Sequence, residues 1–335
     1  MEEIGLPWTA APLARLPARI ADLPGALLLS GQAGLGKRTT ALFLARAILC
    51  ESARDGLGAC GACASCHLIA AGNHPDLRLV ELATEEDPAG EGEEAASSAK
   101  KPSKQISVDR IRSLGEFVTT TAYRGRAKVI IIAPAEALHP AAANAVLKIL
   151  EEPPGNTFFL LVSHRPDRLL PTVRSRCFQI PFSLPAPELA LGWLKDRGVE
   201  QPELALAQGG YAPLAALERS ESAEYWTQRK ALLDALARPG FNPVVAAERA
   251  EPIEGPALAG LLQQWAYDIA SIKAGGKPRY HLDFQAALQA VAGHASAVSL
   301  MAWYDTVIQY GRVSQHPLNK RLAVESVLSS YPGLN

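Results

Sequence analysis

Short apolar runs alternate with stretches of helical periodicity through the first half of the chain. The run Ala26 to Ser30 (ALLLS) leads into a glycine-rich turn, and residues 39–49 then place apolar side chains at helical spacing. The same pattern predicts further strands at 77–82, 129–132, 157–162 and 177–180, and further helices at 108–123 and 140–152. Strands that alternate with helices predict an α/β fold with a parallel sheet covered on both faces.

The pattern changes after Pro181, where strand-like runs give way to Ala- and Leu-rich helical periodicity. We therefore expect an α/β domain over residues 1–184, a small helical domain over 185–226 and a larger helical domain over 227–335. The apolar helical faces at 258–262 and 324–328 are as consistent with a self-contained core as with an interface to a partner.

Residues 84–105 differ from the rest of the first domain. An acidic half rich in glycine, alanine and serine is followed by the basic run KKPSK at 100–104. Such a composition buries too little apolar surface to offset the entropy of ordering. We expect a mobile surface insertion here, with a dedicated binding tail as the alternative.

The overall composition is that of a globular protein, with 335 residues, 48% hydrophobic and 20% charged. The formal net charge of -1 provides no global positive field for nucleic acid, so any DNA contact must be local or shared with partners. The first residues carry no basic leader, and no apolar run reaches the length of a membrane span. We expect a cytoplasmic protein with no membrane contact.

The turn after the first predicted strand has the pattern of a phosphate-binding loop, GQAGLGK at residues 31–37. Its glycines Gly31, Gly34 and Gly36 allow successive backbone N–H groups to curl around phosphate oxygens. Lys37 is positioned to reach the outer phosphates from the start of the helix.

Two features of an ATP-hydrolysing site are missing. Arg38 stands where Ser or Thr normally binds magnesium, and a guanidinium has no acceptor for a cation. Ala133 and Pro134 follow the strand at 129–132, where acidic residues should hold the metal, and Glu136 would need an unusual path back. We expect no magnesium and no ATP turnover here. Weak nucleotide or phosphate binding, and a glycine turn with only a packing role, remain alternatives.

Arg176 lies in the sequence Ser175-Arg176-Cys177, just before the last predicted strand and after a basic helical stretch with Arg165, Arg168 and Arg174. An arginine in such a place can reach across a subunit boundary and neutralise charge that develops on a neighbour's γ-phosphate. Spacing alone favours the alternative of an ordinary surface arginine.

Four cysteines, Cys50, Cys60, Cys63 and Cys66, crowd into a short excursion after the first helix. In a reducing compartment they indicate a metal rather than disulfides, and four thiolates can enclose a structural zinc ion in a module over residues 50–76. An iron–sulfur cluster, a c-type haem attachment, a redox pair and His67 as a ligand are the alternatives. Cys177 stands apart, and we expect it to pack in the core.

Several of these segments resemble the AAA+ clamp-loader subunits of bacterial DNA polymerase III. The resemblance covers residues 25–182 and lies in the runs 144–154 (NAVLKILEEPP) and 169–177 (LLPTVRSRC), and in the cysteine module that closes on Gly72 to Asp76. It implies a AAA+ module with a parallel sheet, a small helical lid over 185–226, and a helical collar over 227–335 that joins the subunits.

The same resemblance implies roles for single residues. Arg176 would complete the ATP site of a neighbouring gamma/tau subunit, and the four cysteines would bind zinc. The ATP-hydrolysing gamma/tau subunits have the hydroxyl and the acids that this chain lacks. Ser163 falls at a sensor position at a strand end, and residues 209–214 lack the second sensor arginine.

The resemblance therefore implies a subunit without catalysis of its own. With gamma/tau and delta subunits, it would help to load the sliding clamp onto primed DNA. An active ATP-hydrolysing subunit and a zinc-dependent DNA-binding module are the alternatives.

Overall fold

The structure is a computed structural model that describes residues 6–53, 57–82, 105–124, 126–151, 153–314 and 319–332. The chain divides into two compact units, Met1–Pro185 and Ala186–Asn335. The predicted insertion at 84–105 lies outside the described residues, except for Gln105.

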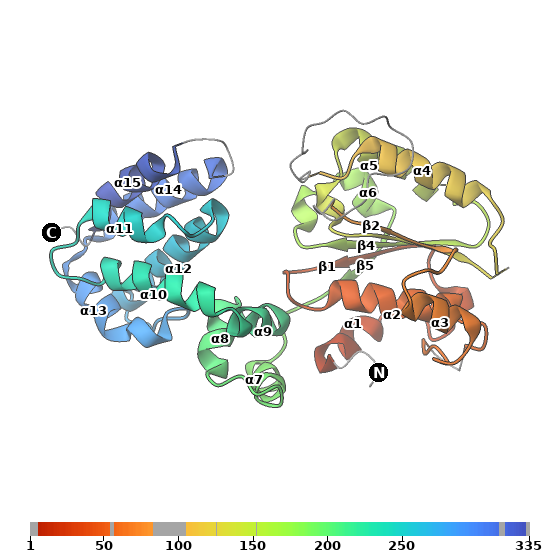
Figure 1. Cartoon of the computed structure of the whole chain (residues 1–335), viewed down its shortest axis with the longest axis horizontal. Helices are drawn as coiled ribbons and strands as arrows, with labels where there is room; N and C mark the ends of the chain where they lie inside the picture. The colour runs from red at the N-terminus through yellow and green to blue at the C-terminus, as the bar shows by residue number, and fades with distance from the viewer. Residues whose placement is uncertain are drawn as a thin grey trace. The chain divides into compact units, whose positions relative to one another are not determined.

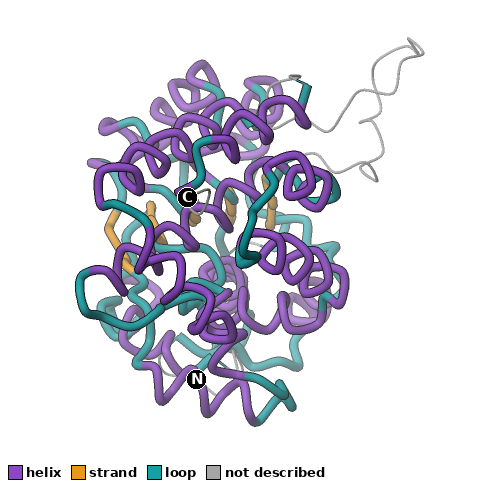
Figure 2. The backbone as a smooth tube through the Cα atoms, turned by 90° about the vertical axis from the view of Figure 1, so that its left-hand side faces the viewer, coloured by secondary structure: helices purple, strands orange, loops and turns teal. Residues whose placement is uncertain are grey.

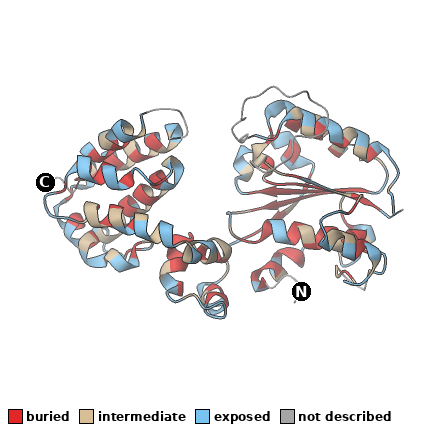
Figure 3. Cartoon of the chain, in the orientation of Figure 1, coloured by how far each residue is buried: buried red, intermediate tan, exposed pale blue. Residues whose placement is uncertain are grey.

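The first unit contains a five-stranded parallel sheet in the order β2-β3-β4-β1-β5 (Figure 1). The strands are β1 (Ala26–Ser30), β2 (Leu77–Val80), β3 (Lys128–Ile132), β4 (Thr157–Ser163) and β5 (Phe178–Pro181). Every residue of β1, β3 and β4 is buried, whereas the edge strands β2 and β5 are partly exposed (Figure 3). The continuous apolar runs in the sequence correctly predicted strands buried on both faces.

Helices cover both faces of this sheet (Figure 1). One face carries α1 (Ala10–Leu13), α2 (Lys37–Leu49) and α3 (Ala64–Ala70), and the other carries α4 (Val108–Thr119), α5 (Pro140–Glu151) and α6 (Pro171–Ser175). Short 3-10 turns are η2 (Pro7–Thr9), η3 (Ile20–Asp22), η4 (Ala135–Ala137) and η5 (Pro166–Arg168). Apolar residues of α4, α5 and α6 form one core with β1, β3 and β4. The predicted α/β class is confirmed.

Two helices are shorter than the sequence pattern predicted. Helix α4 ends at Thr119 rather than at Tyr123, because the Lys128 ammonium group donates to the carbonyls of Phe117 and Thr120 and caps the helix end. The basic stretch before Arg176 is not one helix. It consists of the turn η5 and the five-residue helix α6, which Pro171 begins.

The second unit is helical throughout its described residues (Figure 2). Its helices are α7 (Pro187–Lys195), α8 (Pro202–Gln208), α9 (Pro213–Glu221), α10 (Ala223–Leu236), α11 (Pro243–Ala250), α12 (Gly255–Lys273), α13 (Gln285–His294), α14 (Ala297–Val313) and α15 (Lys320–Ser329), with the turn η6 (Leu282–Phe284). None of the helices in the described part of the chain is long and apolar enough to cross a membrane.

One apolar core holds α10 to α15 together around Trp265 and Trp303, which are fully buried. The Trp265 indole donates to the Tyr331 hydroxyl at 2.8 Å, and the Trp303 indole donates to the Val327 carbonyl at 3.0 Å. The apolar faces at 258–262 and 324–328 point into this core. The structure therefore supports a self-contained core for these apolar faces rather than an interface to a partner.

Residues on both sides of the expected boundary at 226 are hydrogen-bonded to each other within this unit. The Gln208 side chain donates to the Tyr280 carbonyl at 2.6 Å. The Tyr211 hydroxyl donates to the Arg279 carbonyl at 3.0 Å. The division of residues 186–335 into a lid and a collar stays a prediction.

Candidate functional site

The phosphate loop joins the end of β1 to the start of α2, as the sequence predicted, and brings Gly31, Gly34, Gly36 and Lys37 together. Gly31 has a φ of 144°, and a Cβ atom there would lie 2.3 Å from the Phe182 carbonyl oxygen, so only glycine fits. Gly36 has a φ of 79° and is the N-cap of α2. The glycines are thus required by the backbone itself, whether or not a phosphate binds.

Lys37 is turned back onto its own loop. Its side chain donates to the Gln32 carbonyl at 2.6 Å, and the residue is only 2% exposed. Burial lowers the pKa of Lys37 to about 8, and the negative charge of Glu136 opposes this shift. The lysine that would contact outer phosphates is therefore held by its own loop, and it loses its proton at a lower pH than an exposed lysine does.

Arg38 occupies the expected magnesium position with a bidentate ion pair. Its Nε and Nη2 atoms donate to the two carboxylate oxygens of Glu81 at 2.6 and 3.0 Å. Thr39, one residue later, is exposed, and the Thr40 hydroxyl donates to the Gly36 carbonyl at 2.9 Å. None of these groups offers a free oxygen ligand at position 38.

Glu136 reaches the carboxyl end of β4 by way of η4. One carboxylate oxygen accepts from the His164 backbone N–H at 2.9 Å, and the other is buried without a hydrogen bond from any described residue. The pKa of His164 is lowered by burial and by the charge of Lys37, while Glu136 opposes the shift. The negative charge of Glu136 thus raises the pKa of both Lys37 and His164. This proximity could not be predicted from the separation of these residues in the sequence.

Trp8 contacts the phosphate loop and was not predicted from the sequence to be part of this site. Its indole N–H donates to the Leu35 carbonyl at 3.0 Å, and both residues are buried. A buried tryptophan normally finds such an acceptor. A tryptophan before the first strand suggests a buried side chain, but the sequence does not indicate that its hydrogen-bond partner lies 27 residues away.

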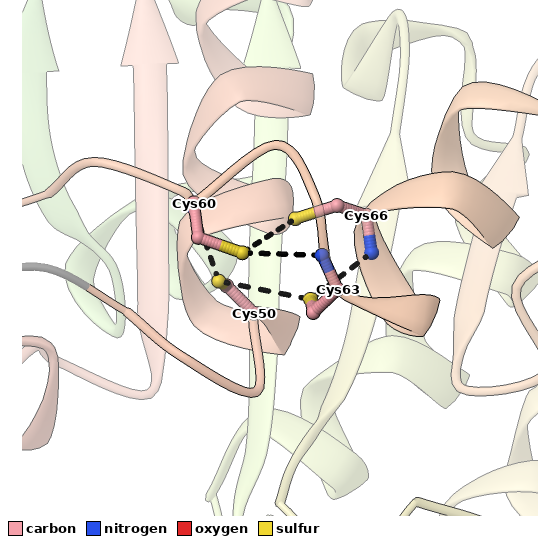
Figure 4. Close-up of side chains that lie close together, drawn as sticks. All are labelled: Cys50, Cys60, Cys63 and Cys66. Atoms are coloured by element: carbon pink, nitrogen blue, oxygen red, sulfur yellow. Dashed lines mark hydrogen bonds between the residues drawn. The ribbon is translucent and has the colours of Figure 1, made fainter.

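The structure brings the four predicted cysteines together (Figure 4). Their sulfur atoms all lie within 4.8 Å of one another, and the pairs Cys50–Cys63 and Cys60–Cys66 are each 3.9 Å apart. A tetrahedral zinc with Zn–S bonds of about 2.3 Å places its sulfurs about 3.8 Å apart. The cluster could therefore hold a metal ion, and His67 is not part of it.

Backbone N–H groups point at these sulfurs (Figure 4). Cys60, Cys63 and Cys66 donate to Cys50, Cys60 and Cys63 at 3.2, 3.3 and 3.4 Å. Burial raises the pKa of Cys63, but N–H groups and neighbouring thiols outweigh it and lower the pKa to about 6. These donors favour the thiolate form of Cys63, which binds metals, whereas burial raises the pKa of Cys50 and raises that of Cys66 to about 12.

Secondary structure fixes where the cysteines lie. Cys50 is the C-cap of α2, Cys63 is the N-cap of α3, and Cys66 lies on α3. The neighbouring Glu51 accepts from the Ser65 hydroxyl at 2.8 Å and pairs with Arg124 at 3.2 Å, which ties the module to the loop before β3.

Cys177 is separate from the cysteine cluster. It is buried in the core beside α5 and α6, and burial raises its pKa to about 12. It therefore packs in the core, as expected.

Arg176 is the C-cap of α6 and lies two residues before the edge strand β5. Its Nη1 donates to the Thr172 carbonyl at 3.1 Å, and its Nη2 lies 2.5 Å from a carboxylate oxygen of Glu151. The side chain remains 37% exposed. The predicted arginine is therefore at the surface and already paired within its own chain.

Comparison with known proteins identifies the family. The sequence profile described as "DNA polymerase III, delta subunit" matches residues 17–186. The DNA polymerase III subunit delta-prime of Pseudomonas aeruginosa is 43% identical over 214 residues, which are 63% of this chain and 60% of that protein. The Escherichia coli subunit of the same name is 34% identical over 237 residues, 69% of this chain and 65% of that protein. The matched region thus spans roughly six tenths of the length of these relatives.

A solved structure of a DNA polymerase III gamma subunit-related protein from Thermotoga maritima has a TM-score of 0.46 at 18% identity, covering 93% of this chain and 96% of that one. The sequence profile covers half of the chain, over a range that contains the phosphate loop, the cysteine cluster and Arg176. The chain belongs to the DNA polymerase III delta-subunit family, and its matched relatives are delta-prime subunits.

Proposed function

We propose that this chain is a subunit of the DNA polymerase III clamp loader that does not hydrolyse ATP. Together with gamma/tau and delta subunits, it helps to place the sliding clamp on primed DNA. Its own contribution to the chemistry is Arg176, which acts as an arginine finger in the ATP site of a neighbouring gamma/tau subunit.

The ion pair between Arg38 and Glu81 is the main support for the proposal that this chain does not hydrolyse ATP. Magnesium needs oxygen ligands in a near-octahedral arrangement, and a guanidinium supplies only donors and a positive charge. The carboxylate of Glu81 beside this position is engaged by Arg38 through both oxygens. Phosphoryl transfer relies on the metal to neutralise charge on the phosphates, so a site without it is not expected to turn over ATP.

The surroundings of Arg176 support its role toward a neighbour. The residue precedes the edge strand β5, and its side chain is accessible to solvent. An arginine supplied from another subunit stabilises the charge of the transition state and raises the rate by orders of magnitude. Such a residue needs a position at the rim of its own domain, which Arg176 has.

We further propose that the metal of the cysteine cluster is zinc and that its role is structural. Four thiolates would fill a tetrahedral coordination sphere and leave no open position for catalysis. The module itself has only a small apolar cluster around Ala59, Cys50 and Cys66. Metal binding would supply folding free energy that this segment cannot obtain from a core.

The domain roles follow the same proposal. Residues 185–226 would form the lid and residues 227–335 the collar that joins the subunits. The cytoplasmic location expected from the sequence stays a prediction.

The proposal is tested by reconstituting the chain with gamma/tau, delta, the sliding clamp and primed DNA. Arg176→Ala should leave assembly intact and lower the DNA-stimulated ATPase rate at least about tenfold. Arg112→Ala, which removes an equally charged and more exposed side chain of the same unit, should leave the rate unchanged.

Three results would contradict the proposal in different ways. An unchanged ATPase rate for Arg176→Ala would remove the arginine finger. Magnesium-dependent ATP hydrolysis by the isolated chain would show an active ATPase subunit instead. A salt-dependent affinity of the isolated chain for DNA would point to the DNA-binding alternative.

A further inference from the structure

Glu151 is the last residue of α5, and the sequence alone gives no reason for an acid there. The carbonyl groups at a helix C-terminus carry partial negative charge, so a carboxylate at this end is locally unfavourable. Its oxygen lies 2.5 Å from Nη2 of Arg176, whose positive charge compensates for this position. The placement of Glu151 is thus explained by Arg176.

The backbone around Arg176 is already fixed. Val173 and Cys177, on either side of it, are buried in the same core as Leu150, the residue before Glu151. Helices α5 and α6 therefore present Glu151 and Arg176 from one rigid base. The remaining freedom lies in the long arginine side chain, which is held at two points, by Thr172 and by Glu151.

These contacts leave the guanidinium able to bind a phosphate. Arginine has five N–H donors; Nη1 of Arg176 donates to the Thr172 carbonyl, and Nη2 forms the ion pair with Glu151. Toward the residues that the structure describes, at least three of these donors are unused and can bind an anion, and the side chain is 37% exposed. Glu151 need not dissociate from Arg176 when a neighbour's triphosphate arrives.

We propose that Glu151 is a positioning residue that holds the Arg176 guanidinium in the orientation in which it meets the triphosphate of the neighbouring subunit. This inference rests on the proposed function of Arg176. An arginine that is ordered before the reaction loses less side-chain entropy in the transition state, so the benefit appears in the rate of hydrolysis. Binding of ATP, which the neighbour's own loop provides, is unaffected.

The reconstituted complex tests this with steady-state ATPase measurements over a range of ATP concentrations. Glu151→Ala should lower kcat about two- to fivefold, the size expected for an exposed ion pair, and leave KM unchanged. Glu151→Gln keeps an acceptor oxygen but loses the charge, so its kcat should lie between those of Glu151→Ala and the unaltered complex. Asp109→Ala is the matched control, because it removes an exposed acid paired with Arg112 at 3.3 Å in the same unit.

A double-mutant cycle separates this inference from the function on which it rests. In an Arg176→Ala background, Glu151→Ala should have no further effect, because Glu151 acts only through Arg176. An unchanged or higher kcat for Glu151→Ala, or an equal loss in both backgrounds, would overturn the positioning role. If Arg176→Ala itself has no effect, the arginine finger fails rather than the pairing. Should Glu151→Ala fold poorly, Glu151→Gln decides the question, because it keeps the shape of the side chain but removes its charge: a kcat equal to that of the unaltered complex would overturn the positioning role.

Discussion

Arg38 and Glu81 lie 43 residues apart in the sequence and form a two-point ion pair beside the phosphate loop, with N–O distances of 2.6 and 3.0 Å. The pair connects the first turn of α2 to the residue after β2. It places a guanidinium where an ATPase needs a metal ligand, and it neutralises the nearby carboxylate.

This pair predicts that magnesium does not strengthen ATP binding by the isolated chain, as a titration with a fluorescent ATP analogue would show. Arg38→Ser supplies a hydroxyl and releases Glu81, so magnesium should then raise the affinity several-fold. Hydrolysis should stay at background, because Ala133 and Pro134 still follow β3. A strong magnesium dependence in the unaltered chain would contradict this account.

Lys37 should titrate near pH 8 in the folded chain, measured by NMR of carbon-13-labelled lysine. Glu136→Gln removes a nearby negative charge, so the pKa should fall further. The unfolded chain holds this proton up to about pH 10.4, and the folded chain releases it near 8. The contribution of Lys37 to stability therefore increases as the pH rises through this interval. A value near that of an exposed lysine would show that Lys37 is not held in the loop.

Removal of metal from the cysteine cluster should destabilise the first unit. Cys63→Ser is expected to abolish stoichiometric zinc, measured by metal analysis under reducing conditions, and to lower the free energy of unfolding by at least about 2 kcal/mol. Cys177→Ala is the control, because it alters a buried cysteine outside the cluster and should leave the zinc content unchanged. A chain that is fully folded without bound metal would exclude a structural zinc site.

The ion pair Arg229–Asp283 should be important for the second unit. Arg229 is 1% exposed, and both terminal nitrogens donate to Asp283 at 2.7 Å. Asp283→Asn leaves a buried charge without its counter-ion and should cost about 3 kcal/mol in urea unfolding. The exposed pair Lys230–Asp234 gives the comparison, since Asp234→Asn should change stability by less than about 0.5 kcal/mol. Equal losses of stability for Asp283→Asn and Asp234→Asn would show that the burial of Arg229 does not make its ion pair more important for stability.

The buried pair Asp268–His281 should make the second unit sensitive to acid. Burial lowers the pKa of His281, and the pKa of Asp268 is lowered because hydrogen bonds from residues 279–281 outweigh its burial. Below about pH 6.5 the unfolded chain binds a proton at His281 that the folded chain does not bind, so the free energy of unfolding decreases as the pH is lowered. His281→Asn should flatten this dependence in unfolding experiments between pH 5 and 7, whereas the exposed His294→Asn should not.

The sheet and the cysteine cluster could be predicted because their signals are local. Strands β1, β3 and β4 are buried on both faces and hence continuously apolar, and metal ligands follow a characteristic spacing. The glycine loop was also placed correctly, because strand, glycines and lysine are consecutive.

Long-range partners could not be predicted in the same way. The sequence indicated that Arg38 and Arg176 are unusual, but Glu81 and Glu151 became their partners only through the folding of β2 and α5. Helix α4 ends early because of Lys128, which lies nine residues beyond the helix and is the first residue of β3. The sequence therefore gives no indication that this lysine contacts the end of α4. Side-chain contacts of this kind override a helical pattern at its end.

Helix α2 is fastened at both ends, by the glycine loop before Lys37 and by Cys50 after Leu49. Helix ends normally open first, and their amides exchange with solvent faster than those of the middle turns. A metal ion on Cys50 would slow this opening at the last turn, so amide exchange there should report metal occupancy.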